Sequence, residues 1–203
     1  MKTFVIATNN KKKLNEMARI LSPLGINVVT AKDINIDLGD VEENGATFAD
    51  NAYIKAKSAF DLVDSEYCIV ADDSGLCVDA LGGKPGIYSA RFGGDGLSDS
   101  DRVDLLLNEM EDIPADKRGA HFACAICAIM DDGTVITAEG KCHGYIGFEP
   151  TGDGGFGYDP IFMVNDKSFS QLSAQEKDEC SHRGVALRVF KEKLESFLEG
   201  KQC

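Results

Sequence analysis

Two long apolar segments, residues 121–130 and 134–142, are separated only by Asp131, Asp132 and Gly133. Their composition favours β-strands, and a tight turn between two such segments indicates a β-hairpin. The second half of the chain is therefore predicted to carry a long hairpin.

The first half of the chain alternates between short apolar segments and segments with helical spacing. Strands are predicted at residues 3–7, 26–30 and 67–71, and helices at 14–21, 47–63, 98–110 and 185–198, with loops at 32–46, 82–96 and 152–157. Helices between strands, followed by a hairpin, predict an α/β fold with a mixed sheet. Because no repeat, low-complexity segment or linker divides the 203 residues, we expect one domain over residues 1–203.

The composition argues against several classes of protein. The apolar segments are far shorter than the ~20 residues needed to span a bilayer, so no membrane protein is expected. A formal net charge of −13 disfavours duplex nucleic acid, which is bound through many Lys and Arg residues. The first residues show no signal-peptide pattern and the seven cysteines have no regular spacing, so we expect a cytoplasmic protein with reduced thiols.

Two of these cysteines, Cys124 and Cys127, have the spacing of a zinc knuckle, and Cys142 and His143 follow later. Positions three apart in one strand point to opposite faces of the sheet. A shared zinc ion is therefore disfavoured, and buried thiols are the preferred interpretation.

A candidate anion site lies between the first predicted strand and helix, where unpaired backbone N–H groups and the helix dipole attract negative charge. Its residues are Thr8, Asn9, Asn10, Lys11, Lys12 and Lys13. The pattern is neither a Walker A loop nor a GxGxxG motif. The alternative is a helix cap with solvated lysines.

A candidate metal site follows the strand at 67–71, where Asp72 and Asp73 precede Ser74 and Gly75. Ligand sites gather beyond the carboxyl ends of strands in open α/β sheets, and adjacent carboxylates repel unless a cation or proton lies between them. Mg²⁺ suits so sparse a ligand set, since substrate and water complete its shell. The alternative is a solvated turn.

Two later segments carry candidate recognition groups. His182 and Arg183 precede the last predicted helix and could bind carbonyl or phosphate oxygens, or merely cap the helix and carry surface charge. The glycine-rich segment ending in Phe156, Gly157, Tyr158 and Asp159 could stack a base and accept from its N–H, or form only a tight turn.

Taken together, these segments resemble the inosine triphosphate pyrophosphatase family, the XTP/dITP diphosphatases that remove deaminated purine nucleotides. The matching blocks span almost the whole chain in family order. They are Ala7-Thr8-Asn9-Asn10 with Lys13, Glu42-Glu43 before Gly45 and Thr47-Phe48, Asn51-Ala52 with Lys55-Ala56, Ala71-Asp72-Asp73-Ser74-Gly75-Leu76, residues 85–91, residues 155–162 and Ser181-His182-Arg183-Gly184.

The resemblance implies a homodimer of subunits with an elongated mixed sheet, flanking helices and two lobes around a nucleotide cleft. It implies Mg²⁺-dependent hydrolysis of ITP, dITP or XTP to the monophosphate and pyrophosphate. The implied roles are triphosphate binding by residues 8–13, metal binding by Asp73 with Glu42 or Glu43, proton acceptance by Asp73, and substrate contact by Ser74. Asp72, Lys13 and Lys55 complete the predicted catalytic set, and Phe156, Gly157, Tyr158, Asp159, Lys177, His182 and Arg183 would surround the base.

Asn9 and Lys12 stand where many members have glycine, which leaves the contacts of that loop open. The chemistry agrees with the resemblance, because lysines and a metal can neutralise a triphosphate within an acidic protein. Two other functions are weighed: a nucleotide sensor without turnover, and a phosphatase that releases single phosphates. The first predicts a missing carboxylate, whereas Glu42, Asp72 and Asp73 are all present.

Overall fold

The computed structural model describes residues 2–8, 10–22, 25–39, 41–63 and 66–200. Seven strands form one sheet in the order β2-β1-β3-β4-β5-β6-β7. Strand β1 is parallel to β2 and to β3, whereas β6 is antiparallel to β5 and to β7, so the predicted mixed sheet is confirmed. The strands are β1 (Thr3–Ile6), β2 (Asn27–Thr30), β3 (Tyr67–Val78), β4 (Gly119–Ile129), β5 (Val135–Ile146), β6 (Phe162–Val164) and β7 (Lys167–Ser168).

The predicted hairpin is formed by β4 and β5, which are neighbours in the sheet. Its turn is closed by a hydrogen bond of 2.8 Å from the Met130 N–H to the Thr134 carbonyl. Gly133 has a φ of +83°, which a residue with a side chain rarely adopts. The turn therefore needs glycine at this position.

The helices α1 (Lys11–Leu21), α2 (Phe48–Phe60), α3 (Asp99–Glu109) and α5 (His182–Gly200) correspond to the predicted ones, while α4 (Ala174–Cys180) was not predicted. The predicted start of α2 is confirmed, because Thr47 and Asp50 form a reciprocal capping box. Among the described residues, no helix is long and apolar enough to cross a membrane.

The chain divides into two compact units. Unit 1 comprises Met1–Asp73, Cys124–Gly140 and Arg183–Cys203, and unit 2 comprises Ser74–Ala123 and Lys141–His182. The chain thus passes from one unit to the other at Asp73–Ser74 and at His182–Arg183, within two of the predicted site segments. The predicted nucleotide cleft between two lobes stays a prediction.

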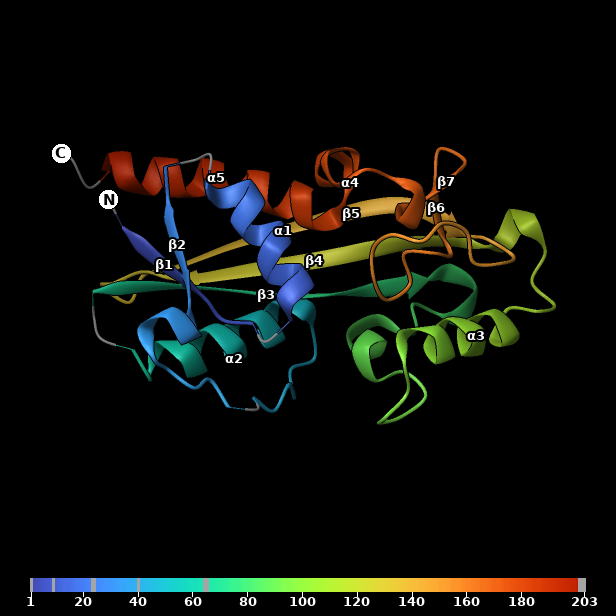
Figure 1. Cartoon of the computed structure of the whole chain (residues 1–203), viewed down its shortest axis with the longest axis horizontal. Helices are drawn as coiled ribbons and strands as arrows, with labels where there is room; N and C mark the ends of the chain where they lie inside the picture. The colour runs from blue at the N-terminus through green and yellow to red at the C-terminus, as the bar shows by residue number, and fades with distance from the viewer. Residues whose placement is uncertain (1, 9, 23–24, 40, 64–65, 201–203) are drawn as a thin grey trace. The chain divides into compact units, whose positions relative to one another are not determined.

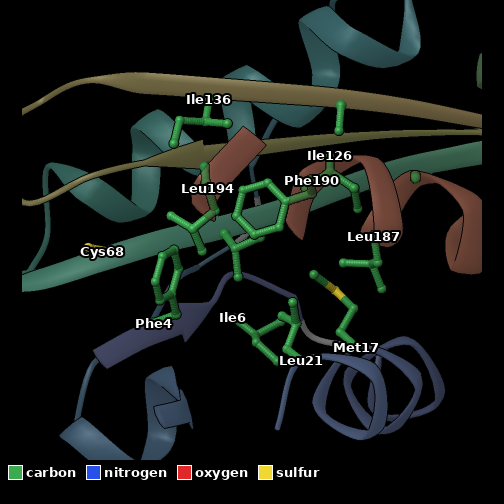
Figure 2. Packing of buried hydrophobic residues seen from close by; sticks show 14 of the residues in the cluster. Phe4, Ile6, Met17, Leu21, Cys68, Ile126, Ile136, Leu187, Phe190 and Leu194 are labelled. Carbon is green, nitrogen blue, oxygen red and sulfur yellow. The ribbon is translucent and has the colours of Figure 1, made fainter. Parts of the chain in front are cut away.

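Within unit 1, α1 and α5 cover one face of the sheet and α2 covers the other (Figure 1). Side chains of β3 alternate between these faces, since successive residues of a strand point in opposite directions. Cys68 and Val70 pack with α1 and α5, whereas Ile69 and Ala71 pack with α2. Figure 2 shows the first of these cores, where Phe190 of α5 lies near Phe4 of β1.

Within unit 2, the second half of β3 packs its Leu76 and Val78 against α3 and against Phe122 and Phe162. The glycine-rich segment is held close to its neighbours. A Cβ atom on Gly155 would lie 2.1 Å from Oδ2 of Asp159, and one on Gly154 would lie 2.7 Å from the Ser170 carbonyl oxygen. This close packing explains Gly154 and Gly155, whereas Gly157 is favoured by its φ of +58°.

One local prediction is wrong. Asp72 to Gly75 are not a turn beyond the strand but lie inside β3, which continues to Val78. The strand continues because its second half buries Leu76 and Val78, and this burial outweighs the weak strand preference of Asp, Ser and Gly.

Candidate active site

The Asp72 carboxylate is enclosed by cations within unit 1. Its side chain is fully buried, and its Oδ2 lies 3.1 Å from Lys13 Nζ and 2.9 Å from Arg183 Nη2. Arg183 Nε also donates to this oxygen at 3.3 Å. Arg183 Nη1 pairs in turn with Glu16 of α1. The four side chains form one network on the face that α1 and α5 cover.

The next residue, Asp73, has a different set of partners on the α2 side of β3. Its Oδ1 lies 2.9 Å from Lys55 Nζ, and its Oδ2 accepts a hydrogen bond of 3.2 Å from Asn51 Nδ2. Lys55 Nζ also lies 3.2 Å from Oε2 of Glu43. The ammonium group therefore bridges two carboxylates, those of Asp73 and Glu43.

Asp72 and Asp73 thus have different ion-pair partners, because adjacent strand residues point to opposite faces, and a single cation held between them stays a prediction. Their titration differs accordingly. Burial would raise the pKa of Asp72, but attraction to Lys13 and Arg183 outweighs it and holds the pKa below its usual value. Burial raises the pKa of Asp73, and Lys55 offsets only part of this effect. Asp73 is therefore the better proton acceptor.

Two carboxylates around one cation fit what Mg²⁺ requires from a protein, since water and phosphate oxygens supply the other ligands. Glu43 is half-buried and faces Lys55, whereas Glu42 is exposed. Of the two glutamates that the sequence left open, Glu43 is the one placed beside Asp73. No group of three or more His, Cys, Asp or Glu suited to a metal occurs in the described ranges, so the donor set is sparse.

The predicted anion loop begins α1. The Asn10 side chain caps the helix by accepting from the N–H groups of Lys12 and Lys13, at 2.9 and 3.2 Å. The Thr8 hydroxyl oxygen accepts from the Asn10 N–H at 3.2 Å. The predicted helix cap is therefore confirmed. Lys11 and Lys12 are exposed, but Lys13 pairs with the buried Asp72, so the interpretation of all three lysines as solvated is wrong. Asn9 lies outside the described residues.

In unit 2, Asp159 organises the glycine-rich segment. Its Oδ2 accepts from the Phe156 N–H at 2.8 Å and from Lys177 Nζ at 2.7 Å. Lys177 Nζ also lies 4.8 Å from the centre of the Phe156 ring. The Gly157 N–H donates to Asp99 of α3 at 2.8 Å. Four predicted base-contacting residues, at 156, 157, 159 and 177, are thus tied together in one unit.

Tyr158 belongs to the core of unit 2. Its ring is buried and its hydroxyl donates to the Ser89 carbonyl at 3.0 Å. Phe156 is only half-buried, so it is the aromatic ring of this segment that retains accessible surface. Ser74, also half-buried, is the first residue of unit 2 and lies in β3.

His182 and Arg183 form the first turn of α5 rather than preceding it, and both are buried. The interpretation of this pair as surface charge is therefore wrong. The His182 ring stacks on Phe122, with ring centres 4.7 Å apart and an angle of 14°. Burial against an aromatic ring, together with the ion pairs of Arg183, explains why the helix can begin with these polar residues.

No local sequence pattern predicts a role for Glu16, Asn51 or Asp99. Glu16 follows Lys13 by three positions, so both lie on one face of α1, but this spacing alone assigns no role. Asn51 precedes Lys55 by four positions and shares its face of α2, but nothing in the sequence showed its contact with Asp73. Asp99 approaches Gly157 from 58 residues away, which no local pattern reveals.

The six cysteines that the structure describes are free thiols. Cys124 packs on the α1 and α5 face and Cys127 on the α2 face, so the two thiols point apart as predicted. Burial raises the pKa of Cys124 to about 12 and that of Cys127 to about 11. Both are packing groups at neutral pH.

Known proteins match this chain over all the candidate site segments described above. The sequence model of the Ham1 family matches residues 4–193. The chain belongs to the Ham1 family. The dITP/XTP pyrophosphatase of Clostridium perfringens is 42% identical over 205 residues, covering 98% of this chain and 100% of the relative. That of Escherichia coli K12 is 42% identical over 198 residues, covering 96% of this chain and 98% of the relative.

Solved structures of the Ham1 family share the fold. A HAM1 protein from Coxiella burnetii superposes with a TM-score of 0.84 at 35% identity, covering 97% of this chain and all of that one. The Ham1 protein of Staphylococcus aureus gives 0.80 at 39% identity, covering 98% and 100%. The predicted α/β fold is confirmed. So, at the level of the family, is the predicted enzyme class, a nucleoside triphosphate pyrophosphatase.

Proposed function

We propose that this Ham1 chain hydrolyses ITP, dITP and XTP to the monophosphate and pyrophosphate with Mg²⁺. The observation that carries the proposal is the pair of carboxylates of Asp73 and Glu43, both in contact with Lys55 Nζ. On the other face of β3, Asp72 gathers Lys13 and Arg183. One strand thus carries a cation-binding group and an anchor for cationic side chains.

Asp73 and Glu43 would hold the Mg²⁺ ion, and Glu42 would remain in solvent. When bound, the ion would neutralise phosphate charge and polarise the phosphoryl group that reacts. Lys55 would then shift from the two carboxylates toward the phosphates, because its ammonium group and the ion compete for the same oxygens. Support comes from the half-buried position of Glu43 and its contact with Lys55.

Asp73 is the proposed proton acceptor. Water attacks the α-phosphorus and forms a new P–O bond, its proton passes to an Asp73 oxygen, and the bond from the α-phosphorus to the bridging oxygen breaks. Pyrophosphate leaves with that electron pair as an intact unit. The position of Asp73 at the proposed metal site supports the role, since a carboxylate beside the ion can accept the proton of the attacking water.

The triphosphate would be bound by residues 8–13 with Lys55. Lys13 is held by Asp72, at 3.1 Å, and Lys11 and Lys12 add exposed charge beside it. The proposed role of Asp72 is to keep Lys13 and Arg183 in place, which makes it a positioning residue for these two cations. Ser74 follows Asp73 in the strand and would contact the substrate.

The base would be bound by Phe156, Asp159, Lys177, His182 and Arg183, with Gly157 and Tyr158 shaping the segment. An arginine only donates hydrogen bonds, so it favours the six-position oxygen of hypoxanthine or xanthine over the amino group of adenine. We therefore propose that ATP is a poor substrate. The proposed assembly is a homodimer, and the proposed location is the cytoplasm; the resemblance of the sequence motifs supports both.

The test is product analysis with ITP, dITP, XTP, GTP and ATP at fixed Mg²⁺. We expect pyrophosphate and the monophosphate from the first three, and little product from ATP. Orthophosphate as the first product would indicate a phosphatase that releases single phosphates. Tight binding without any product would indicate a nucleotide sensor.

A further inference from the structure

The amide of Asn51 joins two parts of unit 1 that are distant in sequence. Asn51 lies in the first turn of α2 and is completely buried. Its Oδ1 accepts a hydrogen bond of 2.8 Å from the Gly45 N–H, and its Nδ2 donates one of 3.2 Å to Asp73 Oδ2. One side chain thus contacts both the segment that carries Glu43 and the strand that carries Asp73.

Only a carboxamide of this length satisfies both partners. A backbone N–H needs an acceptor and a carboxylate needs a donor, so the two contacts determine which amide atom points to each. Aspartate could not donate to Asp73 and would repel it, while leucine would leave the Gly45 N–H without its acceptor. Asparagine is therefore required for chemistry rather than for packing.

Gly45 is matched to this contact. A Cβ atom at position 45 would lie 2.5 Å from Cβ of Asp50 and 2.7 Å from Oδ1 of Asn51. A Cβ atom does not come this close to an atom to which it is not bonded, so any side chain here must push the segment away from α2. Glycine is needed for close approach, and it stands two residues after Glu43, which a chain of ~3.3–3.6 Å per residue keeps nearby.

We propose that Asn51 is a positioning residue for the metal site: by holding Gly45 and Asp73 together, it sets the separation of the Glu43 and Asp73 carboxylates. The inference rests on the proposed function, in which these two groups hold Mg²⁺. It explains why both carboxylates reach the same ammonium group, Lys55 Nζ, at 3.2 and 2.9 Å. Groups that orient metal ligands typically influence affinity strongly, although they do not touch the ion.

Two substitutions break the contact from opposite sides. Asn51→Ala removes both hydrogen bonds, and Gly45→Ala pushes the segment away while leaving the Asn51 amide in place. Thr47→Ala is the matched control, because it removes only the hydroxyl that caps the same end of α2 and keeps the Thr47 carbonyl that accepts from the Asn51 N–H. Any general loosening of this helix end appears in all three variants.

The measurement is a titration with Mn²⁺ in the absence of nucleotide, in which electron paramagnetic resonance detects the bound ion. We expect Asn51→Ala and Gly45→Ala to raise the Mn²⁺ dissociation constant about tenfold or more, and Thr47→Ala to leave it unchanged. The double variant, with both Asn51→Ala and Gly45→Ala, should bind Mn²⁺ about as weakly as the weaker-binding single variant. Both changes disrupt the same Asn51–Gly45 contact, so their effects should not add. Amide exchange of the Gly45 N–H should accelerate in Asn51→Ala and stay slow in Thr47→Ala.

Wild-type affinity for Mn²⁺ in both variants would overturn the positioning role while leaving the proposed metal site intact. Equal weakening in Thr47→Ala would also overturn it, because the effect would then belong to the helix end. If the wild-type chain binds no Mn²⁺, the proposed metal site itself fails, and the positioning role fails with it. Gly45→Ala decides the question should Asn51→Ala not fold, since position 45 is only half-buried.

Discussion

Replacing Asp72 and Asp73 separately by Asn should give two opposite phenotypes, although the residues are neighbours in β3. Both changes remove one charge and keep the size of the side chain. Asp72 sits between Lys13 and Arg183, whereas Asp73 contacts Lys55 and Asn51. The first change should therefore affect mainly stability, and the second mainly turnover.

The expected loss for Asp72→Asn follows from its burial. Removing one partner of a buried ion pair typically costs about 3–5 kcal/mol, because the remaining charge stays buried without compensation. Glu16 still pairs with Arg183, which places the expected loss near the lower end. One kcal/mol shifts the thermal midpoint of a chain of this size by ~2–4 °C, so we expect a decrease of roughly 6–12 °C.

The expected result for Asp73→Asn is different. Burial raises the pKa of Asp73 despite Lys55, so its charge is not favoured in the folded chain and its removal should cost little stability. Lys55 also keeps Glu43 as a partner. The change does remove the proposed proton acceptor, and positioned proton transfer is typically worth ~10² to ~10⁴ in rate. We expect a loss of at least ~10² in kcat.

The thermal midpoint by circular dichroism and the single-turnover rate of pyrophosphate release from ITP, measured on the same preparations, test both expectations. Raised Mg²⁺ separates loss of the metal from loss of the proton acceptor. The reasoning is refuted if Asp72→Asn melts with the wild-type chain, or if Asp73→Asn is destabilised but active. The second outcome would make Asp73 a structural residue.

Three further outcomes are expected. The pKa of Asp72 is lowered from 3.8 in the folded chain, so as the pH falls below this value the unfolded chain binds the proton first and the folded chain loses stability. Below this pH, the free energy of unfolding should therefore depend less on pH in Asp72→Asn than in the wild-type chain. An unchanged slope would contradict the ion pairing assigned to Asp72. Lys13→Ala should reduce kcat/KM for ITP and XTP by similar factors, since its proposed contact is with the phosphates that both substrates share, and a strong bias toward one base would argue against this role. Glu43→Gln should raise the Mg²⁺ concentration that gives the half-maximal rate, while Glu42→Gln leaves it unchanged. The reverse result would make Glu42, and not Glu43, the metal ligand.

Much of the fold could be predicted from local patterns. Thr47 and Asp50 predicted the start of α2 because a capping box needs only residues three positions apart. The tight turn at Gly133 predicted the β4–β5 hairpin for the same reason. The helix α4 was missed because its seven residues bury little apolar surface, so its sequence carries no helical stripe.

The residues of the candidate site could be chosen from the sequence, but their contacts with one another could not. Asp72 to Gly75 have the composition of a turn, but they lie in a strand whose second half buries Leu76 and Val78 in unit 2 and which has neighbouring strands on both sides. Arg183 reaches Asp72 across 111 positions of sequence, a distance over which neither periodicity nor capping rules apply. Such contacts depend on the assembled sheet, so local sequence patterns cannot predict them.

The geometry of β3 explains why Asp72 and Asp73 have different surroundings. In a turn, both carboxylates could have met one cation, and their pKa values would have belonged to the pair. In β3 the side-chain period of two sends Asp72 toward α1 and α5 and Asp73 toward α2. Asp72 pairs directly with Lys13 and Arg183, and Asp73 pairs directly with Lys55. Attraction outweighs burial at Asp72, while burial outweighs attraction at Asp73. Two identical side chains thereby differ in charge state: Asp72 keeps its charge beside Lys13 and Arg183, whereas the raised pKa of Asp73 is what the proposed role as proton acceptor requires.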